Sequence, residues 1–314
     1  MPMHIPAPDD IQAAALRTAG YLRRTPIVEV AGADFGLDLS DPLTFKLEFL
    51  QHAGSFKSRG AFNSLLAATI PAAGVAAASG GNHGAAVAYA ARALGHRATI
   101  FVPEVSAPVK IARIEAYGAE VCVGGARYAD AAARCAQFVA ETGAYEVHPY
   151  DTFETVAGQG TVALEWQRSA PGLDTVQVAV GGGGLIAGIA AWYGGRVKVI
   201  GVEPEGSRCL HAARAAGEPV DVPVESIAAD SLGARRVGNL PFAVAQRSVA
   251  DVVLVADAAI AAAQRMLWDR LRVAVEPGGA AALAALTSGR YVPSSSERIG
   301  VLLCGANVDL AQLG

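Results

Sequence analysis

One repeated pattern most constrains the fold of this chain. A short β-branched run leads through a glycine-containing turn into an alanine-rich helical stretch, and the pattern recurs from residue 75 to residue 202. Strands that alternate with helices are typical of parallel sheets covered by helices on both faces. The 314 residues, of which 52% are hydrophobic, suffice for one large or two modest α/β domains. The sequence therefore predicts an α/β protein with open, mostly parallel sheets.

One block of this pattern looks self-contained. Residues 74–148 hold four predicted strands, at 75–79, 98–102, 120–123 and 144–148. We expect this block to form a small domain inserted into a larger one, which is built from residues 1–73 and 149–314. Residues 208–239 are polar and weakly periodic, which predicts a helix followed by a surface loop.

Composition and charge exclude several classes of partner. A net charge of −4 argues against nucleic acid or an anionic membrane. No apolar stretch is sustained enough to span a membrane, and the first residues lack the pattern of a signal peptide. The four cysteines show neither a CxxC pair nor the spacing of a disulfide framework. These features predict a cytoplasmic protein whose main partner is neither nucleic acid nor a membrane.

A run of four glycines lies between a predicted strand at 175–180 and a helix that starts near residue 185. Ligands bind at the carboxyl ends of parallel strands. Gly181, Gly182, Gly183 and Gly184 let backbone N–H groups approach an anion, and the helix N-terminus adds a favourable dipole. The same residues also fit the glycine fingerprint of a dinucleotide-binding loop, and Glu203 follows at the sequence separation expected for a ribose contact. This loop alone leaves open both a small phosphorylated cofactor and a nicotinamide-dependent dehydrogenase.

A lysine lies in the loop that opens the helix predicted at residues 62–68. With Ser55 as the N-cap, Lys57 falls in the first helical turn. The helix dipole there and desolvation by Phe56 both lower the pKa of the lysine amine. A neutral amine can act as a nucleophile and a proton carrier. The alternative interpretation is an ordinary solvated lysine on the surface. Lys57 alone does not distinguish the two, so the catalytic interpretation depends on the neighbouring loops.

Two further loops follow predicted strands. In the first, the Ser79 hydroxyl and free N–H groups suit a carboxylate, and the Asn82 amide suits a phenolic oxygen. Both side chains also fit ordinary helix caps, and His83 fits a structural histidine at least as well as a catalytic one. In the second loop, Cys304 places a small polarisable group where it can face a cofactor ring.

Taken in this order, the loops resemble the pyridoxal-phosphate enzymes of the tryptophan synthase β fold type (fold type II). Within that group they are similar to the serine/threonine dehydratase and serine racemase branch. The cysteine-synthase branch has Asp and Thr where this chain has Arg59 and His83. The matching segments are 54–61, 79–84, 157–161, 181–188, 276–280 and 305–309.

The resemblance implies a role for each residue of the site. Lys57 is the catalytic residue, which forms a Schiff base with pyridoxal 5′-phosphate. The implied cofactor contacts are Phe56, Lys57, Asn82, Gly181, Gly182, Gly183, Gly184, Glu276 and Cys304. The implied substrate contacts are Ser79, Gly80, Asn82, His83 and Tyr150. A thiol at Cys304 does not hold the ring nitrogen protonated, which favours prompt loss of a β-leaving group.

The reaction implied is α,β-elimination from a β-hydroxy amino acid such as L-threonine or L-serine, giving a 2-oxo acid and ammonia. The family also implies a homodimer. Tyr150 and Phe153 stand where many relatives have smaller or polar groups, so a bulkier substrate such as phenylserine or hydroxyaspartate is the alternative. Packing of these two rings between the domains explains them equally well. A binding protein that kept the fold without turnover is disfavoured because the lysine loop is intact.

Two departures from the family narrow the prediction. Racemases carry Ser where this chain has Gly80, which predicts that racemisation is minor. The divalent-cation site of some relatives uses two carboxylates, of which only Glu203 remains, followed by Ser207 and Cys209. We therefore predict no divalent metal, while a monovalent ion near Glu203 stays open.

Overall fold

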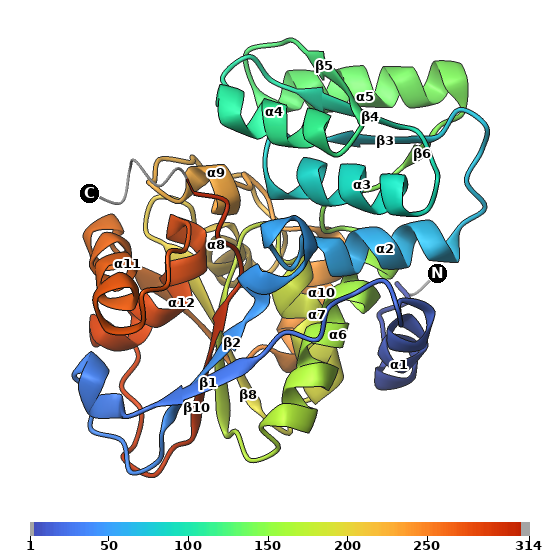
Figure 1. Ribbon diagram of the computed structural model, residues 1–314. Helices are drawn as coiled ribbons and strands as arrows, with labels where there is room; N and C mark the ends of the chain where they lie inside the picture. The colour runs from blue at the N-terminus through green and yellow to red at the C-terminus, as the bar shows by residue number, and fades with distance from the viewer. Residues whose placement is uncertain (1–2, 309–314) are drawn as a thin grey trace.

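The computed structural model describes residues 3–308, and this part of the chain contains two sheets. The larger sheet has six strands in the order β1-β2-β10-β7-β8-β9 (Figure 1). β1 pairs antiparallel with β2, and all other pairs are parallel. The strands are β1 (Ile27–Val30), β2 (Leu43–Leu47), β7 (Thr175–Ala179), β8 (Lys198–Pro204), β9 (Asp251–Val255) and β10 (Ile299–Leu303).

The smaller sheet has four parallel strands in the order β5-β4-β3-β6. They are β3 (Val75–Ala78), β4 (Ala98–Val102), β5 (Glu120–Val123) and β6 (Tyr145–Glu146). All four lie within residues 74–148, the segment predicted to be an inserted domain. The domain boundaries themselves stay a prediction.

Helices cover both sheets. α12 packs on β7, β8, β9 and β10, with α11 outside it, while α6, α7 and α10 pack together on the other side in Figure 1. The helices are α1 (Pro8–Arg17), α2 (Lys57–Ala67), α3 (Asn82–Ala93), α4 (Pro108–Ala116), α5 (Tyr128–Thr142), α6 (Phe153–Ser169), α7 (Gly184–Tyr193), α8 (Cys209–Ala216), α9 (Ala229–Leu232), α10 (Asn239–Ser248), α11 (Asp257–Leu271) and α12 (Pro277–Thr287). Short 3₁₀ turns are η1 (Gly32–Phe35), η2 (Glu48–Leu50) and η3 (His52–Gly54). No helix in residues 3–308 is long and apolar enough to cross a membrane.

Helix α2 lies between the two sheets and packs against both α6 and α3 (Figure 1). On one side, Phe62 and Leu65 join the core of the smaller sheet. On the other, Gly60 faces α6 so closely that a Cβ there would lie 2.5 Å from Gln159 Nε2. A Cβ on Gly158 would lie 2.7 Å from the Arg59 carbonyl oxygen. The glycines of the predicted segments 54–61 and 157–161 therefore let these two helices approach closely.

A buried cluster of charges anchors the start of α2. Arg59 Nε lies 2.9 Å from Glu48 Oε2, and its Nη2 lies 3.0 Å from Glu165 Oε2. Lys46 Nζ lies 2.6 Å from the other oxygen of Glu165. Removing one partner of such a buried pair typically costs about 3–5 kcal/mol, because an uncompensated charge is left behind. Arg59 therefore holds in place the helix that carries Lys57.

The polar segment 208–239 is only partly a surface loop. It contains α8 and α9, but Val222, Ala228, Leu232 and Val237 are buried in the core of the larger sheet. The prediction of an exposed loop is wrong for this half of the segment. Polar residues between these apolar ones hid the pattern, because an irregular buried segment has no fixed period.

Candidate active site

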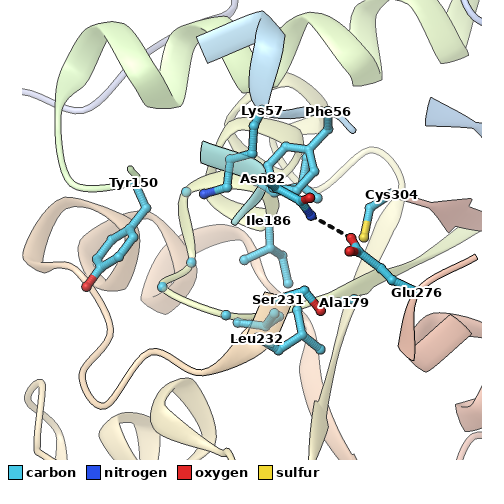
Figure 2. A pocket seen from close by; sticks show the side chains of 16 residues that line it. Phe56, Lys57, Asn82, Tyr150, Ala179, Ile186, Ser231, Leu232, Glu276 and Cys304 are labelled. Carbon is cyan, nitrogen blue, oxygen red and sulfur yellow. Dashed lines mark hydrogen bonds between the residues drawn. The ribbon is translucent and has the colours of Figure 1, made fainter. Parts of the chain in front are cut away.

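The glycine loop, Lys57 and Cys304 meet at one cavity, where β7 and β10 end (Figure 2). The loops that follow these strands supply part of its wall, and the starts of α2, α3 and α12, the loop after β6 and α9 supply the rest. The lining residues are Phe56, Lys57, Asn82, Tyr150, Ala179, Val180, Gly181, Gly182, Gly183, Gly184, Leu185, Ile186, Ser231, Leu232, Glu276 and Cys304. All the predicted cofactor contacts are therefore close together, although they come from five separate parts of the chain.

The glycine loop forms a cradle at the N-terminus of α7. Within the described residues, no hydrogen bond is donated by the amides of Gly182, Gly183, Gly184 or Leu185. Gly183 has φ of +93°, and a Cβ on Gly184 would lie 2.9 Å from the Tyr150 Cα. Glycine is therefore required here both by backbone conformation and by space. Free amides at a helix N-terminus fit the phosphate group of a cofactor.

Lys57 is the first residue of α2, and its amine points toward the cavity (Figure 2). Nζ donates to the Pro149 carbonyl at 2.8 Å and lies 5.2 Å from the centre of the Phe56 ring. Burial lowers the pKa of this amine to about 8, although Cys304 opposes the shift. A substantial fraction of the amine is therefore neutral near physiological pH, as a nucleophile requires.

The predicted N-cap of α2 is wrong. Phe56, not Ser55, occupies the N-cap position, and no side chain caps the helix. Ser55 is instead extended and forms a β-bridge with Gly305, while Phe56 N donates to the Cys304 carbonyl. The segment before α2 thus pairs with the segment after β10, because both must line the same cavity. Lys57 keeps its predicted place in the first turn.

A chain of amides connects the smaller sheet to the larger one. Asn82 Nδ2 donates to Glu276 Oε1 at 2.6 Å, as Figure 2 shows, and Asn82 Oδ1 accepts from Asn307 Nδ2 at 2.6 Å. Asn307 Nδ2 also donates to the Ala53 carbonyl, and Asn307 Oδ1 accepts from Arg113. These contacts fix the direction of the Asn82 amide, which has one N–H left for a ligand oxygen.

Cys304 lies at the end of β10 and is 3% exposed. Its Sγ lies 3.5 Å from the Gly278 carbonyl oxygen. Burial, and then the nearby Glu276, raise the pKa of the thiol. Burial also raises the pKa of the Glu276 carboxyl. The group expected to face a cofactor ring is therefore a neutral thiol. Of the matching segment 305–309, residue Asp309 lies outside the described residues.

A second cavity adjoins the first on the side of the smaller sheet. The predicted substrate contacts Ser79, Gly80, Asn82, His83 and Tyr150 all line it, together with Lys57. Ser79 Oγ accepts from Gly81 N at 3.2 Å. His83 Nε2 donates to the Val147 carbonyl at 2.7 Å, and burial lowers the pKa of its ring to about 3. His83 thus borders the cavity as a neutral ring whose Nε2–H is already used.

The two aromatic residues near residue 150 have different positions. Tyr150 borders both cavities, and a Cβ on Gly182 would lie 2.2 Å from its ring. Its hydroxyl lies 3.4 Å from the Arg236 carbonyl. Phe153 packs instead against the His4 ring, with centroids 4.9 Å apart, and does not line either cavity. Only Tyr150 can therefore influence the size of a bound substrate directly.

Glu203 serves a structural role. Its carboxylate is buried and accepts from Leu210 N at 2.9 Å and His211 N at 2.8 Å, at the start of α8. Burial raises the pKa of this carboxyl to about 7. Both oxygens thus already accept from a helix N-terminus, so the predicted ribose contact is wrong. Residues 3–308 contain no group of three or more Asp, Glu, His or Cys side chains arranged for a metal ion.

Several residues that line the two cavities were not predicted from the sequence. Ser231 and Leu232 lie beside Gly181 from a segment read as a surface loop, and no sequence signal marks them. Asn307 belongs to a matching segment but had no role assigned to it. Ser106 lines the second cavity from the loop after β4.

Comparisons with known proteins agree with this geometry. The family model described as "Pyridoxal-phosphate dependent enzyme" matches residues 19–305. A phenylserine dehydratase of Ralstonia pickettii is 39% identical over 302 residues, covering 94% of this chain and 91% of that protein. The structure of maize serine racemase matches with a TM-score of 0.92 at 37% identity, covering 99% of this chain and 96% of that one. The threonine deaminase of T.th. matches with a TM-score of 0.90 at 36% identity, covering 97% and 99%.

These similarities confirm the tryptophan synthase β-like fold, with two mostly parallel sheets covered by helices. They also establish pyridoxal 5′-phosphate as the cofactor, so the nicotinamide-dependent alternative is wrong. The reaction class is elimination or racemisation of β-hydroxy amino acids. The chain therefore belongs to the pyridoxal-phosphate dependent enzymes, in the serine racemase/threonine dehydratase branch.

Proposed function

We propose that this enzyme eliminates water from a β-hydroxy amino acid, such as L-serine or L-threonine, and releases a 2-oxo acid and ammonia. The observation that carries this proposal is geometric: the amine of Lys57 points toward a cavity that also holds the phosphate cradle and the Cys304 thiol. Bound pyridoxal 5′-phosphate supplies an electron sink for the charge that develops at the substrate Cα. Lys57 would hold the cofactor covalently, and once the substrate amine has displaced it, the freed Lys57 amine would accept the proton from Cα.

The remaining residues hold and orient the cofactor. The free amides of residues 182–185 would bind the phosphate. Asn82, fixed by Asn307 and Glu276, would donate its remaining N–H to the phenolic oxygen of the ring. Phe56 would lie against the ring, and Cys304 would face its nitrogen, since both side chains line the cavity. A neutral thiol there gives no full proton to that nitrogen, which favours early departure of the β-hydroxyl over a long-lived carbanion.

Racemisation is proposed to be a minor reaction. Inversion at Cα needs a proton donor on the face opposite to Lys57, and Gly80 has no side chain that could carry one. The Ser106 hydroxyl lies beside Gly80, but we assign it to the substrate carboxylate and not to Cα. Ammonia release from L-serine and L-threonine tests the elimination. D-serine formation is measured in the same samples, and a rate near that of ammonia release would contradict this assignment.

Phenylserine is the second candidate substrate. Tyr150 borders both cavities, and an aromatic wall can pack against an aryl group on Cβ. The similar protein of Ralstonia pickettii is named a phenylserine dehydratase. Comparing kcat/KM for serine, threonine, hydroxyaspartate and phenylserine decides which substrate the enzyme prefers.

The cytoplasmic location and the homodimer remain proposals that rest on cysteine usage and on the family. Light scattering of the holoenzyme tests the dimer, and a mass near that of one chain would reject it.

A further inference from the structure

Gly80 and Ser106 compete for the same space in the substrate cavity. A Cβ built on Gly80 would lie 2.1 Å from Ser106 Oγ and 2.9 Å from Ser106 Cβ. Gly80 does not have the positive φ that favours glycine. Space, and not backbone conformation, therefore excludes a side chain at position 80. Ser106 fills the room that such a side chain would take.

The sheet brings these two residues together. β3 and β4 are parallel neighbours, with Ala78 opposite Phe101, so the loops after both strands leave the same edge. The Ser106 amide donates to the Pro103 carbonyl at 3.0 Å, which fixes the turn after β4. Ser106 therefore reaches the cavity from a different strand than Gly80, and it is 26 positions further along the chain.

The Ser106 hydroxyl is available to a ligand. It makes no hydrogen bond to any described residue, and it borders the same cavity as Lys57 and Asn82. Beside it lies the first turn of α3, whose leading amides have no acceptor within the helix. A free hydroxyl next to free amides forms a set of donors that suits a carboxylate.

We propose that the Ser106 hydroxyl donates a hydrogen bond to the carboxylate of the amino-acid substrate, in the place left by the missing side chain of Gly80. The proposal rests on the proposed function, since it concerns the same cavity. It makes Ser106 a substrate-binding residue of this chain, supplied by the loop after β4.

Three variants test it: Ser106→Ala, Gly80→Ser and the double variant. In Ser106→Ala, KM for L-serine should rise roughly tenfold to hundredfold, the value of one hydrogen bond to a charged group, while kcat changes little. Gly80→Ser should lose more substrate affinity than Ser106→Ala, because the new Cβ collides with Ser106. An alanine at position 106 would keep its Cβ 2.9 Å from the new Cβ, so the double variant combines Gly80→Ser with Ser106→Gly. It moves the hydroxyl to position 80 without a collision, and it should therefore bind substrate better than Gly80→Ser and recover affinity relative to Ser106→Ala.

L-Alanine serves as an unreactive probe, because it has the carboxylate but no β-hydroxyl. Its binding to the holoenzyme, followed by the cofactor absorbance, should weaken by the same factor in Ser106→Ala. Unchanged alanine binding would overturn the proposal, even if kcat fell, because the hydroxyl would then act elsewhere. A double variant that binds alanine no more tightly than Gly80→Ser would also overturn it.

Two controls keep the outcomes distinct. Ser295→Ala removes an exposed hydroxyl far along the chain and should change neither KM nor alanine binding. A wild-type enzyme that releases no ammonia from any β-hydroxy amino acid would reject the proposed function instead. The alanine measurement would still test Ser106 in that case, since it needs no turnover.

Discussion

The two sides of the active-site cavity hold their groups differently. On the side of the larger sheet, β7 and β10 are entirely buried, and Glu276 and Cys304 are 4% and 3% exposed. On the side of the smaller sheet, Ser79, Gly80 and Ser106 are only partly buried. Densely packed side chains have little room to move. Substitutions in a partly exposed wall usually cost little free energy of unfolding. The buried side therefore suits a fixed cofactor, and the open side suits selection among substrates.

The largest expected effect comes from Lys57, on which both sides depend. Lys57→Ala should lower ammonia release by at least about 10³-fold, because it removes both the covalent attachment and the proton carrier. The variant should bind pyridoxal phosphate without the violet absorbance of the attached cofactor. Lys198→Ala, which removes an exposed lysine, should keep normal turnover. Substantial deamination by Lys57→Ala would reject the assignment.

The pH dependence of cofactor attachment tests the buried environment of this amine. Only the neutral amine reacts, and its pKa is lowered to about 8. The attachment rate to the cofactor-free protein should therefore rise about tenfold from pH 6 to pH 7 and level off above about pH 8. Stopped-flow absorbance measures the rate. If the attachment rate continued to rise to about pH 10, the Lys57 amine would have the pKa of an unperturbed lysine. The buried side of the cavity would then not differ from the open side in this respect.

The glycine loop tests how rigid the buried side is. Gly184→Ala places a Cβ 2.9 Å from the Tyr150 backbone, so overpacking should cost about 1–3 kcal/mol in the free energy of unfolding. Gly181→Ala is the matched control, because its Cβ would lie no closer than 3.3 Å to Leu232. Urea unfolding of the cofactor-free proteins measures both. Equal free energies of unfolding for the two variants would mean that the loop accommodates the added methyl group, and that the buried side is not rigid.

The smallest effect is expected for the Tyr150 hydroxyl. Within residues 3–308 it makes one hydrogen bond, to the Arg236 carbonyl, which is long at 3.4 Å. Tyr150→Phe should change kcat/KM for serine and phenylserine by less than about threefold, since the ring remains. Tyr150→Leu removes the aromatic wall and should lower kcat/KM for phenylserine more than for serine. The reverse order would show that Tyr150 does not shape the substrate pocket.

Local pattern predicted much of the fold. The bounds of β4, β5, β10 and α5 are as expected, because each element has a clear hydrophobic period or a glycine at its end. The glycine loop, the lysine loop and Cys304 could also be found in the sequence, since each follows a strand or opens a helix. Ser231 and Leu232 could not, because a buried irregular segment has no period that distinguishes it from an exposed one.

By itself, the sequence determined which short segments form strands and helices and which loops carry unusual chemistry, because both depend on residues adjacent in the chain. Only the tertiary structure decided which loops face one another. Asn82 meets Asn307 across 225 positions, and Ser106 fills the space beside Gly80. Ser55 pairs with Gly305 where a helix cap was expected. Such contacts depend on how closely the elements pack in space, and no pattern within one segment encodes that distance.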